Sequence, residues 1–420
     1  MFRPPLRRLS IAVTCGLLLL SFPGGTVSAR AETWDLVKFE NRDYVSVQNI
    51  ADFYKLQNAA DDGRSVLLKS PGCTIQGAAG SKELIINGVK FILSYELQPM
   101  DGKILLSRID LTKLVEPVLR PSKMRNARPI RTIVLDAGHG GHDRGATSAF
   151  GNEKDFALDT VMRTRELLLK RGYKVVLTRN NDTFIPLNER ARFANQFRDG
   201  MFVCVHFNAG SPTGTGIETF TLAPRFVPST DQDGPHVSDM TLCAGNIDDP
   251  ENMALATAMH ASLLNRLPMT DRGIKRARFW VLRECTIPAV LIEGGFVSNA
   301  QEAARIAQPV YRQTIAECIV QAIGNYQRAI GQQPNGLLVG NGGAKSPAMN
   351  VANPGMNNLG VGGLSGFSAT GVPGLGPSSA LTQSLTGNGI GSSVPMDGAA
   401  AKVGAAMSND GPTVVVPRKN

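Results

Sequence analysis

Between about residues 130 and 330 the sequence predicts an α/β domain, a mostly parallel sheet with helices on both faces. Short, almost wholly apolar runs alternate there with segments of helical periodicity, and strands buried on both faces have this composition. Two of these runs change character only at their ends, at His206 and Glu293. The expected strands are 133–135, 174–177, 201–206, 216–222 and 287–293, and the expected helices are 155–171, 187–197, 252–267 and 309–330.

Residues 32–116 predict a smaller, β-rich accessory domain. The pair Asn87-Gly88 stands between two apolar runs, which is a hairpin signal. Ser46 and Ser107 each follow a strand pattern and can cap a short helix. This repeated strand–serine–helix unit resembles the small N-terminal domain of some exported bacterial wall enzymes and of copper amine oxidases. We expect it to bind or position a substrate, or to act as a structural spacer, and a basic, proline-containing linker at 117–129 follows it.

The two ends of the chain differ in composition from the rest. Residues 1–31 combine an arginine-containing start with a short apolar core at 11–22, which predicts a signal peptide. The alternative is an uncleaved anchor. From residue 331 to 420 Gly, Pro, Ser, Asn and Ala dominate, and such a segment cannot bury enough apolar area to order itself. We therefore expect export to the periplasm or the extracellular space, no integral membrane segment after cleavage, and a disordered tail.

Charge and cysteine content restrict the class of protein. The formal charge falls from +9 to +5 once the four arginines of the leader are removed, a balance that suits an acidic polymer but is also ordinary for a soluble protein. We expect no nucleic-acid partner. Five cysteines remain, an odd number without CxxC spacing, which argues against a zinc–thiolate site and a fully paired disulfide framework. Cys204 and Cys318 fit buried thiols, and a Cys243–Cys285 disulfide stays open.

Three polar residues follow or end predicted strands, a fourth opens the first predicted helix, and together they suggest a catalytic metal site. His139 lies between glycines after the first strand, Glu153 opens the first helix, and His206 ends the third strand. Sites in such sheets form beyond the carboxyl ends of the strands. Two imidazoles and a carboxylate suit Zn²⁺ and leave a coordination position open for water. Glu293 at the end of the last strand is then the candidate general base, with a pKa raised by its apolar surroundings.

Four motifs resemble one known family. They are DAGHGGHDRGA at 136–146, GNEKDFAL at 151–158, VHFNA at 205–209 and RGIKRARFWVLRECTIPAVLIEGGFVSN at 272–299. In this order they resemble the zinc-dependent N-acetylmuramoyl-L-alanine amidases of bacterial cell walls. The resemblance implies one zinc ion held by His139, Glu153 and His206, with Glu293 as catalytic acid and base. The implied substrate is peptidoglycan, cut at the amide between the lactyl group of muramic acid and L-alanine.

The sequence departs from the family pattern at three positions. Arg144 stands where proline is usual, Phe207 where a small residue is commoner, and Gly294 where a larger apolar residue is usual. Phe207 and Gly294 flank proposed functional residues, so they could reshape the pocket. None of the three removes a proposed ligand or base.

Other readings stay open. The chain could be another exported zinc amidohydrolase or peptidase, or a non-catalytic peptidoglycan-binding protein of the same fold. An activator protein is conceivable, but nothing in the sequence identifies one. The segment 223–251 lacks the sheet pattern, and we hypothesise that it forms a groove wall or a lid over the zinc. Four residues receive weaker assignments. His142 is expected to be an exposed turn residue, His236 a peripheral residue and His260 a peripheral helical residue with a core or surface role. Arg283 could bind a substrate carboxylate or oxyanion, or form a structural ion pair.

Overall fold

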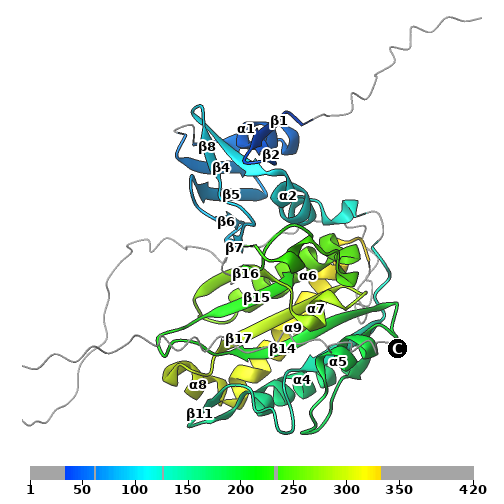
Figure 1. The fold of residues 1–420 in the computed structure, drawn as a ribbon. Helices are drawn as coiled ribbons and strands as arrows, with labels where there is room; N and C mark the ends of the chain where they lie inside the picture. The colour runs from blue at the N-terminus through cyan, green and yellow to red at the C-terminus, as the bar shows by residue number, and fades with distance from the viewer. Residues whose placement is uncertain (1–33, 61–62, 125–126, 231–234, 333–420) are drawn as a thin grey trace, which may run out of the picture. The chain divides into compact units, whose positions relative to one another are not determined.

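The computed structural model describes residues 34–60, 63–124, 127–230 and 235–332 (Figure 1). The expected signal peptide at 1–31 lies outside these residues, and so does the expected tail apart from residues 331 and 332. No helix in the described ranges is both long and apolar enough to cross a membrane. All described residues from Asp35 onward belong to one structural unit.

The centre of this unit is a mixed sheet of eleven strands. Strands β13, β10, β14 and β17 are parallel neighbours in that order. The next strand, β15, runs antiparallel to β17, and β16 is parallel to β15. The bounds are β10 Thr132–Ala137, β13 Lys174–Leu177, β14 Gly200–Asn208, β15 Ile217–Leu222, β16 Asp271–Ala277 and β17 Ala289–Phe296.

The prediction of an α/β domain is confirmed. The sheet is mixed, so the prediction of a mostly parallel sheet is confirmed only for part of it. The reversal at β15 has a local cause. Only residues 209–216 connect β14 to β15, and a parallel connection needs a crossover of about a dozen residues or more. The chain therefore turns back after β14, and β15 runs antiparallel to β17. As a result, the start of β15 lies beside the end of β17.

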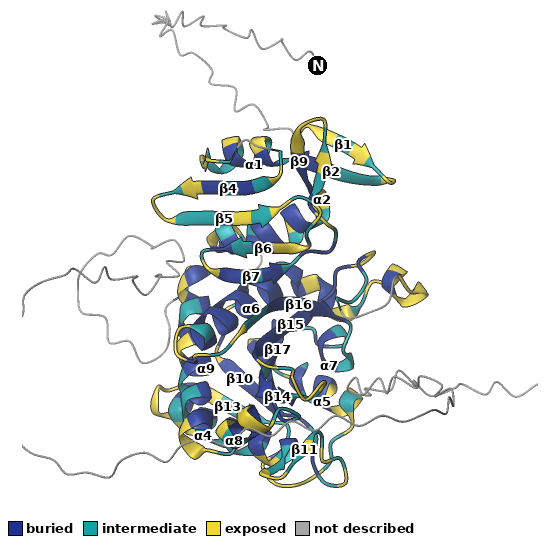
Figure 2. Cartoon of the chain, turned by 90° about the vertical axis from the view of Figure 1, so that its left-hand side faces the viewer, coloured by how far each residue is buried: buried dark blue, intermediate teal, exposed yellow. Residues whose placement is uncertain are grey.

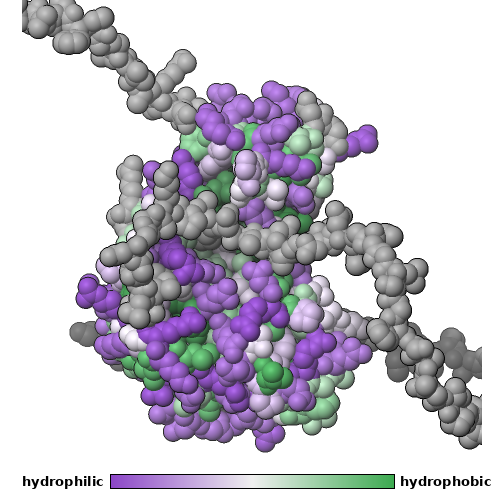
Figure 3. Space-filling model, turned by 180° about the vertical axis from the view of Figure 1, so that it is seen from behind, coloured by the Kyte–Doolittle hydropathy of each residue, from purple (hydrophilic) through white to green (hydrophobic). Residues whose placement is uncertain are grey.

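Helices cover both faces of the central strands, as expected (Figure 2). Helices α4, α6 and α9 pack together on one face, and α5 and α7 pack on the other. The short helix α8 packs against β17. Seen from behind, the molecular surface is mostly hydrophilic, with scattered hydrophobic groups (Figure 3). The bounds are α4 Glu153–Lys170, α5 Leu187–Ala194, α6 Asp249–Leu264, α7 Trp280–Arg283, α8 Ala300–Ile306 and α9 Pro309–Ala329.

The accessory residues form two sets of strands with short helices. One four-stranded sheet has the order β1-β2-β9-β8, and five further strands continue the large sheet as β7-β6-β5-β4-β3. The oxygens of Ser46 and Ser107 accept hydrogen bonds from the amides of Asn49 and Asp110, both at 3.1 Å, so both predicted caps are confirmed. The strands are β1 Leu36–Phe39, β2 Arg42–Ser46, β3 Gln57–Asn58, β4 Ser65–Ser70, β5 Cys73–Ala78, β6 Glu83–Ile86, β7 Val89–Ile92, β8 Gln98–Met100 and β9 Lys103–Ser107, and the helices are α1 Val47–Tyr54, α2 Arg108–Asp110, a π-helix Leu111–Val115, α3 Glu116–Leu119 and a 3-10 turn Pro121–Lys123.

The accessory strands join the central strands directly. Phe91 on β7 pairs with Ile274 on β16, and the Lys90 amide donates to Asp271 Oδ2 at 3.0 Å. Arg276 of β16 and Asp110 of the accessory part, both buried, form an ion pair at 2.8 Å. The sheet therefore continues across the expected boundary at 116/117, and that boundary stays a prediction.

The segment 223–251 does not lie at the end of the sheet where Glu293 is found. Glu218 pairs with Glu293 at the start of β15, so β15 carries the chain away from Glu293 before the segment begins. Arg278, just after β16, then fixes the segment by donating to the carbonyls of Pro224 at 2.7 Å and Val227 at 3.0 Å. For its described residues, the hypothesis of a lid or groove wall over the metal site is therefore wrong.

The five cysteines of the described chain are all free. Cys204, Cys285 and Cys318 are buried, which agrees with the assignment of Cys204 and Cys318 as buried thiols. Cys243 and Cys285 do not form the disulfide that the sequence left open.

Candidate metal centre

The structure brings His139, Glu153 and His206 together. One potential ligand atom from each residue lies within 4.8 Å of those of the other two. Glu153 Oε1 is 3.0 Å from His139 Nε2 and 2.9 Å from His206 Nδ1. The three residues come from the loop after β10, the first turn of α4 and β14. These are the three residues that the sequence suggested as metal ligands.

Two buried arginines hold the loop that carries His139. Arg179 donates to the carbonyls of Ala137 at 2.9 Å and Gly138 at 2.7 Å. Arg190 donates to the carbonyl of His139 at 2.7 Å and pairs with buried Asp136 at 2.9 Å. Carbonyl groups at a strand end would otherwise need water, so the guanidinium groups replace solvent and fix the loop. This allows His139 to keep a left-handed backbone conformation at φ 60°.

Two glycines leave room for the imidazoles. A Cβ atom at Gly138 would lie 2.3 Å from His206 Cε1, and one at Gly145 would lie 2.6 Å from both Glu153 Oε2 and His139 Cδ2. Such distances are far below van der Waals contact, so any side chain would displace the cluster. The two glycines thus form a cradle that leaves room for the three potential ligand groups.

The electrostatics favour a charged carboxylate between the two rings. Burial raises the pKa of Glu153, but hydrogen bonds with His139 and His206 outweigh burial and lower the pKa from 4.5 to about 2. Burial lowers the pKa of His139, whereas its contacts with Glu153 and Asp143 outweigh burial and raise it. The second contact joins His139 Nδ1 and Asp143 Oδ2 at 2.8 Å, which orients the ring and leaves Nε2 toward Glu153.

Glu293 lies beside this cluster. It is paired with His206 between β14 and β17 and with Glu218 between β17 and β15. Its Oε2 atom is buried and has no hydrogen-bond partner among the described residues. Burial raises the pKa of Glu293 well above 4.5, and the nearby carboxylates of Glu153 and Glu218 raise it further, while Lys275 opposes the shift. This is the direction expected for a general base that works near neutral pH.

Glu218 is a site residue that the sequence did not point to. It is buried and accepts hydrogen bonds from Asn208 at 3.0 Å and Lys275 at 3.1 Å, and it also pairs with Arg272. Its only signal in the sequence is one acidic residue inside the predicted strand 216–222. Asp143, the partner of His139, carries no signal beyond its place in the motif.

The weaker candidates lie away from the cluster. His142 is exposed against Phe184, and His236 is exposed, so both assignments agree with the structure. His260 is buried and bonded to Thr219 at 2.8 Å and Asp271 at 2.9 Å, which makes it a core residue.

Arg283 forms the structural ion pair that the sequence left open as one of its two roles, and Phe207 and Gly294 lie against each other. Arg283 pairs with Glu284 at 3.3 Å and stacks on Trp280, as a structural arginine does. Phe207 is buried, and the absence of a side chain at Gly294 leaves room for its ring. A Cβ at Gly294 would lie 2.9 Å from Phe207 Cε1 and 2.9 Å from Ile315 Cδ1.

Comparison with known proteins decides the family. Residues 133–325 match the family described as N-acetylmuramoyl-L-alanine amidase. The uncharacterized protein YqiI of Bacillus subtilis is 31% identical over 202 residues, which are 48% of this chain and 87% of YqiI. This chain belongs to the N-acetylmuramoyl-L-alanine amidase family. The motifs quoted from the sequence all fall in or overlap the matched region, so the suspected family membership is confirmed.

Other amidase relatives match the same part of the chain. The N-acetylmuramoyl-L-alanine amidase AmiC of Escherichia coli is 31% identical over 249 residues, which are 52% of this chain and 58% of AmiC. An uncharacterized cell wall amidase of Bacillus anthracis is 32% identical over 213 residues, which are only 37% of that protein. The solved catalytic domain of CwlV, an amidase from Bacillus (Paenibacillus) polymyxa, is 31% identical and covers 48% of this chain and 99% of its own, with a TM-score of 0.40. The chain thus spans between about a third and most of the length of these relatives.

Proposed function

We propose that this protein hydrolyses the amide bond between N-acetylmuramoyl residues and L-alanine in cell-wall peptidoglycan. One observation carries the proposal. Three potential ligand atoms gather within 4.8 Å, and next to them Glu293 holds a buried carboxylate oxygen without a hydrogen-bond partner among the described residues. A ligand set of this kind together with a separate carboxylate is the arrangement of zinc-dependent hydrolases.

We propose that His139, Glu153 and His206 hold one Zn²⁺ ion. The donor set supports this metal, since imidazole nitrogen and carboxylate oxygen are ligands that Zn²⁺ accepts. The glycine cradle supports it as well, because a Cβ at Gly138 or Gly145 would displace the donors. When bound, the metal would lower the pKa of a water molecule and polarise the substrate carbonyl.

Glu293 would transfer the proton during the reaction. Glu293 would accept a proton from the attacking water, whose oxygen forms the new bond to the carbonyl carbon. As the carbon–nitrogen bond breaks, Glu293 would return this proton to the nitrogen of L-alanine, which leaves as a free amine. Burial beside two other carboxylates raises the pKa of Glu293, which makes the carboxylate a stronger base and favours its acceptance of the proton from water. Asp143 would keep the His139 ring oriented throughout.

The test is digestion of peptidoglycan by purified protein, with and without a chelator, followed by mass analysis of the released ends. Stem peptides that begin with L-alanine, released only in the metal-containing reaction, are the expected result. Cleavage at another bond would favour a different zinc hydrolase. Binding to the polymer without any product, in metal-loaded protein, would favour a non-catalytic wall-binding protein of the same fold.

We also propose the domain layout and location that the sequence predicts. Residues 1–31 would direct export to the periplasm or the extracellular space, where peptidoglycan is the partner. Residues 32–116 would form the accessory part, 117–129 the linker, 130–330 the catalytic part and 331–420 a flexible tail. A protease-protection experiment on fractionated cells tests the location, and a protein found only in the cytoplasm would contradict it.

A further inference from the structure

In the part of the chain that the structure describes, one face of the accessory strands carries no helix. The side chains of Val66, Leu68, Ile75 and Leu84 point to the other face, where they are buried together with Val47 and Ile50 of α1. The alternate residues of β4 to β7 therefore point away from the helices. They are exposed or half-buried: Ser65, Leu67, Lys69, Thr74, Gln76, Ala78, Glu83, Ile85, Lys90 and Ile92. We call these ten residues the open face.

Cross-strand pairing connects the open face to the catalytic residues. Leu67 pairs with Gln76, Gln76 with Ile85, and Ile85 with Lys90, so these four side chains form one row across four strands. The row runs along the same large sheet that contains β16, β15 and β17 (Figure 1).

Gly273 on β16 continues the row. A Cβ there would lie 3.2 Å from Lys90 Cγ and 3.4 Å from Ile92 Cδ1, so position 273 is on the face that carries both side chains. Ile274 pairs with Phe91, so the next residue, Lys275, points to the face that carries Lys90 and Ile92, and it bonds to Glu218 at 3.1 Å. Glu218 in turn pairs with Glu293. The open face and the proposed general base thus lie on one side of one sheet.

The length and composition of this row suit a polymer. Adjacent strands are about 4.8 Å apart, so the six steps from Glu293 to Leu67 cover roughly 30 Å. Polar side chains of the open face include the cations Lys69 and Lys90, of which Lys90 also pairs with Glu83 at 3.1 Å, the amide of Gln76 and the hydroxyl of Thr74. Amides and hydroxyls can bond to the acetamido and hydroxyl groups of amino sugars, and the ammonium groups can attract the carboxylates of stem peptides.

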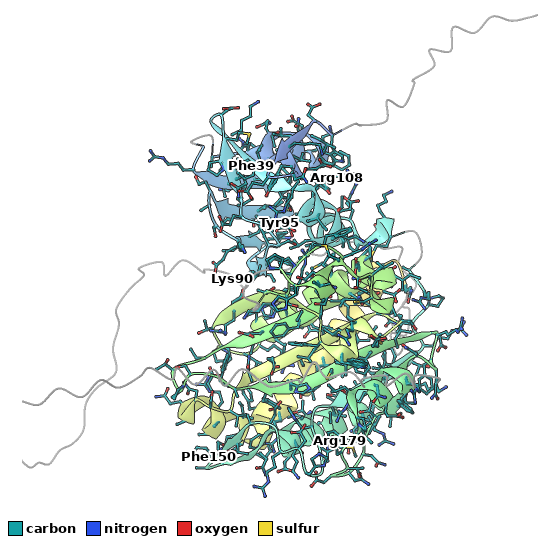
Figure 4. The ribbon with its side chains drawn as sticks, in the orientation of Figure 1. Phe39, Lys90, Tyr95, Arg108, Phe150 and Arg179 are labelled. Carbon is teal, nitrogen blue, oxygen red and sulfur yellow. The ribbon has the colours of Figure 1, made fainter. Side chains whose placement is uncertain are left out.

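The junction between the two parts is well fixed. Arg276 pairs with Asp110 at 2.8 Å behind the sheet, with Ser94 as a further partner of both, and Lys113 pairs with Asp249 at 3.0 Å. Lys90 itself lies where the accessory strands meet the central ones (Figure 4). A surface fixed in this way loses little further freedom when it binds a ligand.

We propose that the open face is a substrate-binding platform that holds the peptidoglycan strand on one side of the scissile amide. This inference rests on the proposed function, because it takes the polymer bound at Glu293 as the occupant. The accessory part would then bind the repeats that neighbour the cleaved one, through the row of Leu67, Gln76, Ile85 and Lys90.

The experiment compares a long substrate with a short one. Gln76→Glu/Ile85→Glu adds two negative charges to the row, and Gln76→Lys/Ile85→Lys adds two positive charges at the same positions. The matched control Leu36→Glu/Gln48→Glu places the negative charges on β1 and on the exposed side of α1, away from the open face. For each protein the KM is measured on solubilised peptidoglycan strands and on a single disaccharide-peptide repeat.

The Glu pair is expected to raise the KM for strands about five- to ten-fold while leaving kcat and the reaction with the single repeat unchanged. The new carboxylates would repel the stem-peptide carboxylates of distant repeats, which the single repeat lacks. The Lys pair and the control pair should keep the wild-type KM. Equal values for wild type and the Glu pair on strands would overturn the platform, and so would equal losses in the Glu and Lys pairs. Failure of the wild type to cleave either substrate would instead refute the proposed function.

Discussion

Glu293 and Glu218 are directly paired across β17 and β15, and their surroundings differ. Glu218 is bonded to Asn208, Arg272 and Lys275. Glu293 has a buried Oε2 atom without a hydrogen-bond partner among the described residues, and its pKa is raised well above 4.5 by burial, by Glu153 and by Glu218. Two adjacent carboxylates thus have different environments: Glu218 is held by three partners, and Glu293, for which we propose proton exchange, keeps a free oxygen atom among the described residues.

The first prediction concerns pH. As a base, Glu293 works only when deprotonated, so kcat should fall as the pH drops through its raised pKa. Glu218→Gln removes a neighbouring negative charge, which should lower the pKa of Glu293 and move this acid limb toward lower pH. A pH–rate profile of both proteins measures the shift. A limb that stays in place, or moves upward, would show that Glu218 does not act on Glu293.

The second prediction concerns Glu293 itself. Glu293→Gln should retain bound metal, since it removes no ligand, and should lower kcat by about 10³-fold or more. The same change should stabilise the fold at neutral pH. The pKa of Glu293 is higher in the folded than in the unfolded chain, so the native state binds more protons and stability falls as the pH rises above the unfolded value. Urea unfolding at pH 7.5 should show a gain that disappears near pH 4, and a loss of stability at pH 7.5 would contradict this.

The third prediction concerns the glycine cradle. Gly138→Ala places a Cβ 2.3 Å from the His206 ring, so the variant should lose most of its bound zinc. Gly210→Ala is the matched control, because a Cβ there meets only Phe296 at 3.7 Å. Metal content per chain, measured by atomic absorption, should fall in the first variant and stay at the wild-type value in the second. Full zinc occupancy in Gly138→Ala would argue against His206 as a ligand.

Apolar runs predicted those parts of the fold that depend on burial alone. Strand β13 coincides with the expected 174–177, and α4 begins two residues before the expected start. Strand β16 escaped prediction because its sequence, DRGIKRA, carries four charged residues. Their charges are satisfied only in the folded chain: Arg272 and Lys275 by Glu218, and Arg276 by Asp110. The periodicity of apolar residues within a segment cannot predict ion pairs with partners that are so distant in sequence.

The candidate site followed the same division. Strand ends and glycines pointed to His139, His206 and Glu293, because a polar residue at the end of an apolar run can be recognised from its neighbours in the sequence. Glu218 could not be found in this way, since its role depends on the reversed direction of β15 beside β17. The same reversal explains why the segment 223–251 leaves the sheet at the end remote from Glu293.

The fourth prediction concerns the ion pair that joins the two parts of the sheet. Asp110→Ala leaves the buried Arg276 without its carboxylate, which should destabilise the fold by about 3–5 kcal/mol. Asp43→Ala, which removes exposed contacts with Lys38 and Arg108, is the control and should have little effect. Urea unfolding followed by circular dichroism gives both values. If Asp110→Ala unfolds like the wild type, the accessory strands are not held by this pair.

The fifth prediction tests whether Phe207 and Gly294 compensate for each other. Phe207→Ala should cost about 3–5 kcal/mol, because it leaves a cavity behind the sheet. Gly294→Val should also destabilise, because its Cβ would lie 2.9 Å from the Phe207 ring. Together they should cost less than the sum of the two single effects, since the new side chain enters the space that the ring vacates. Additive free energies of unfolding in this double-mutant cycle would mean that the two departures from the family pattern are independent, and that each is tolerated for a reason of its own.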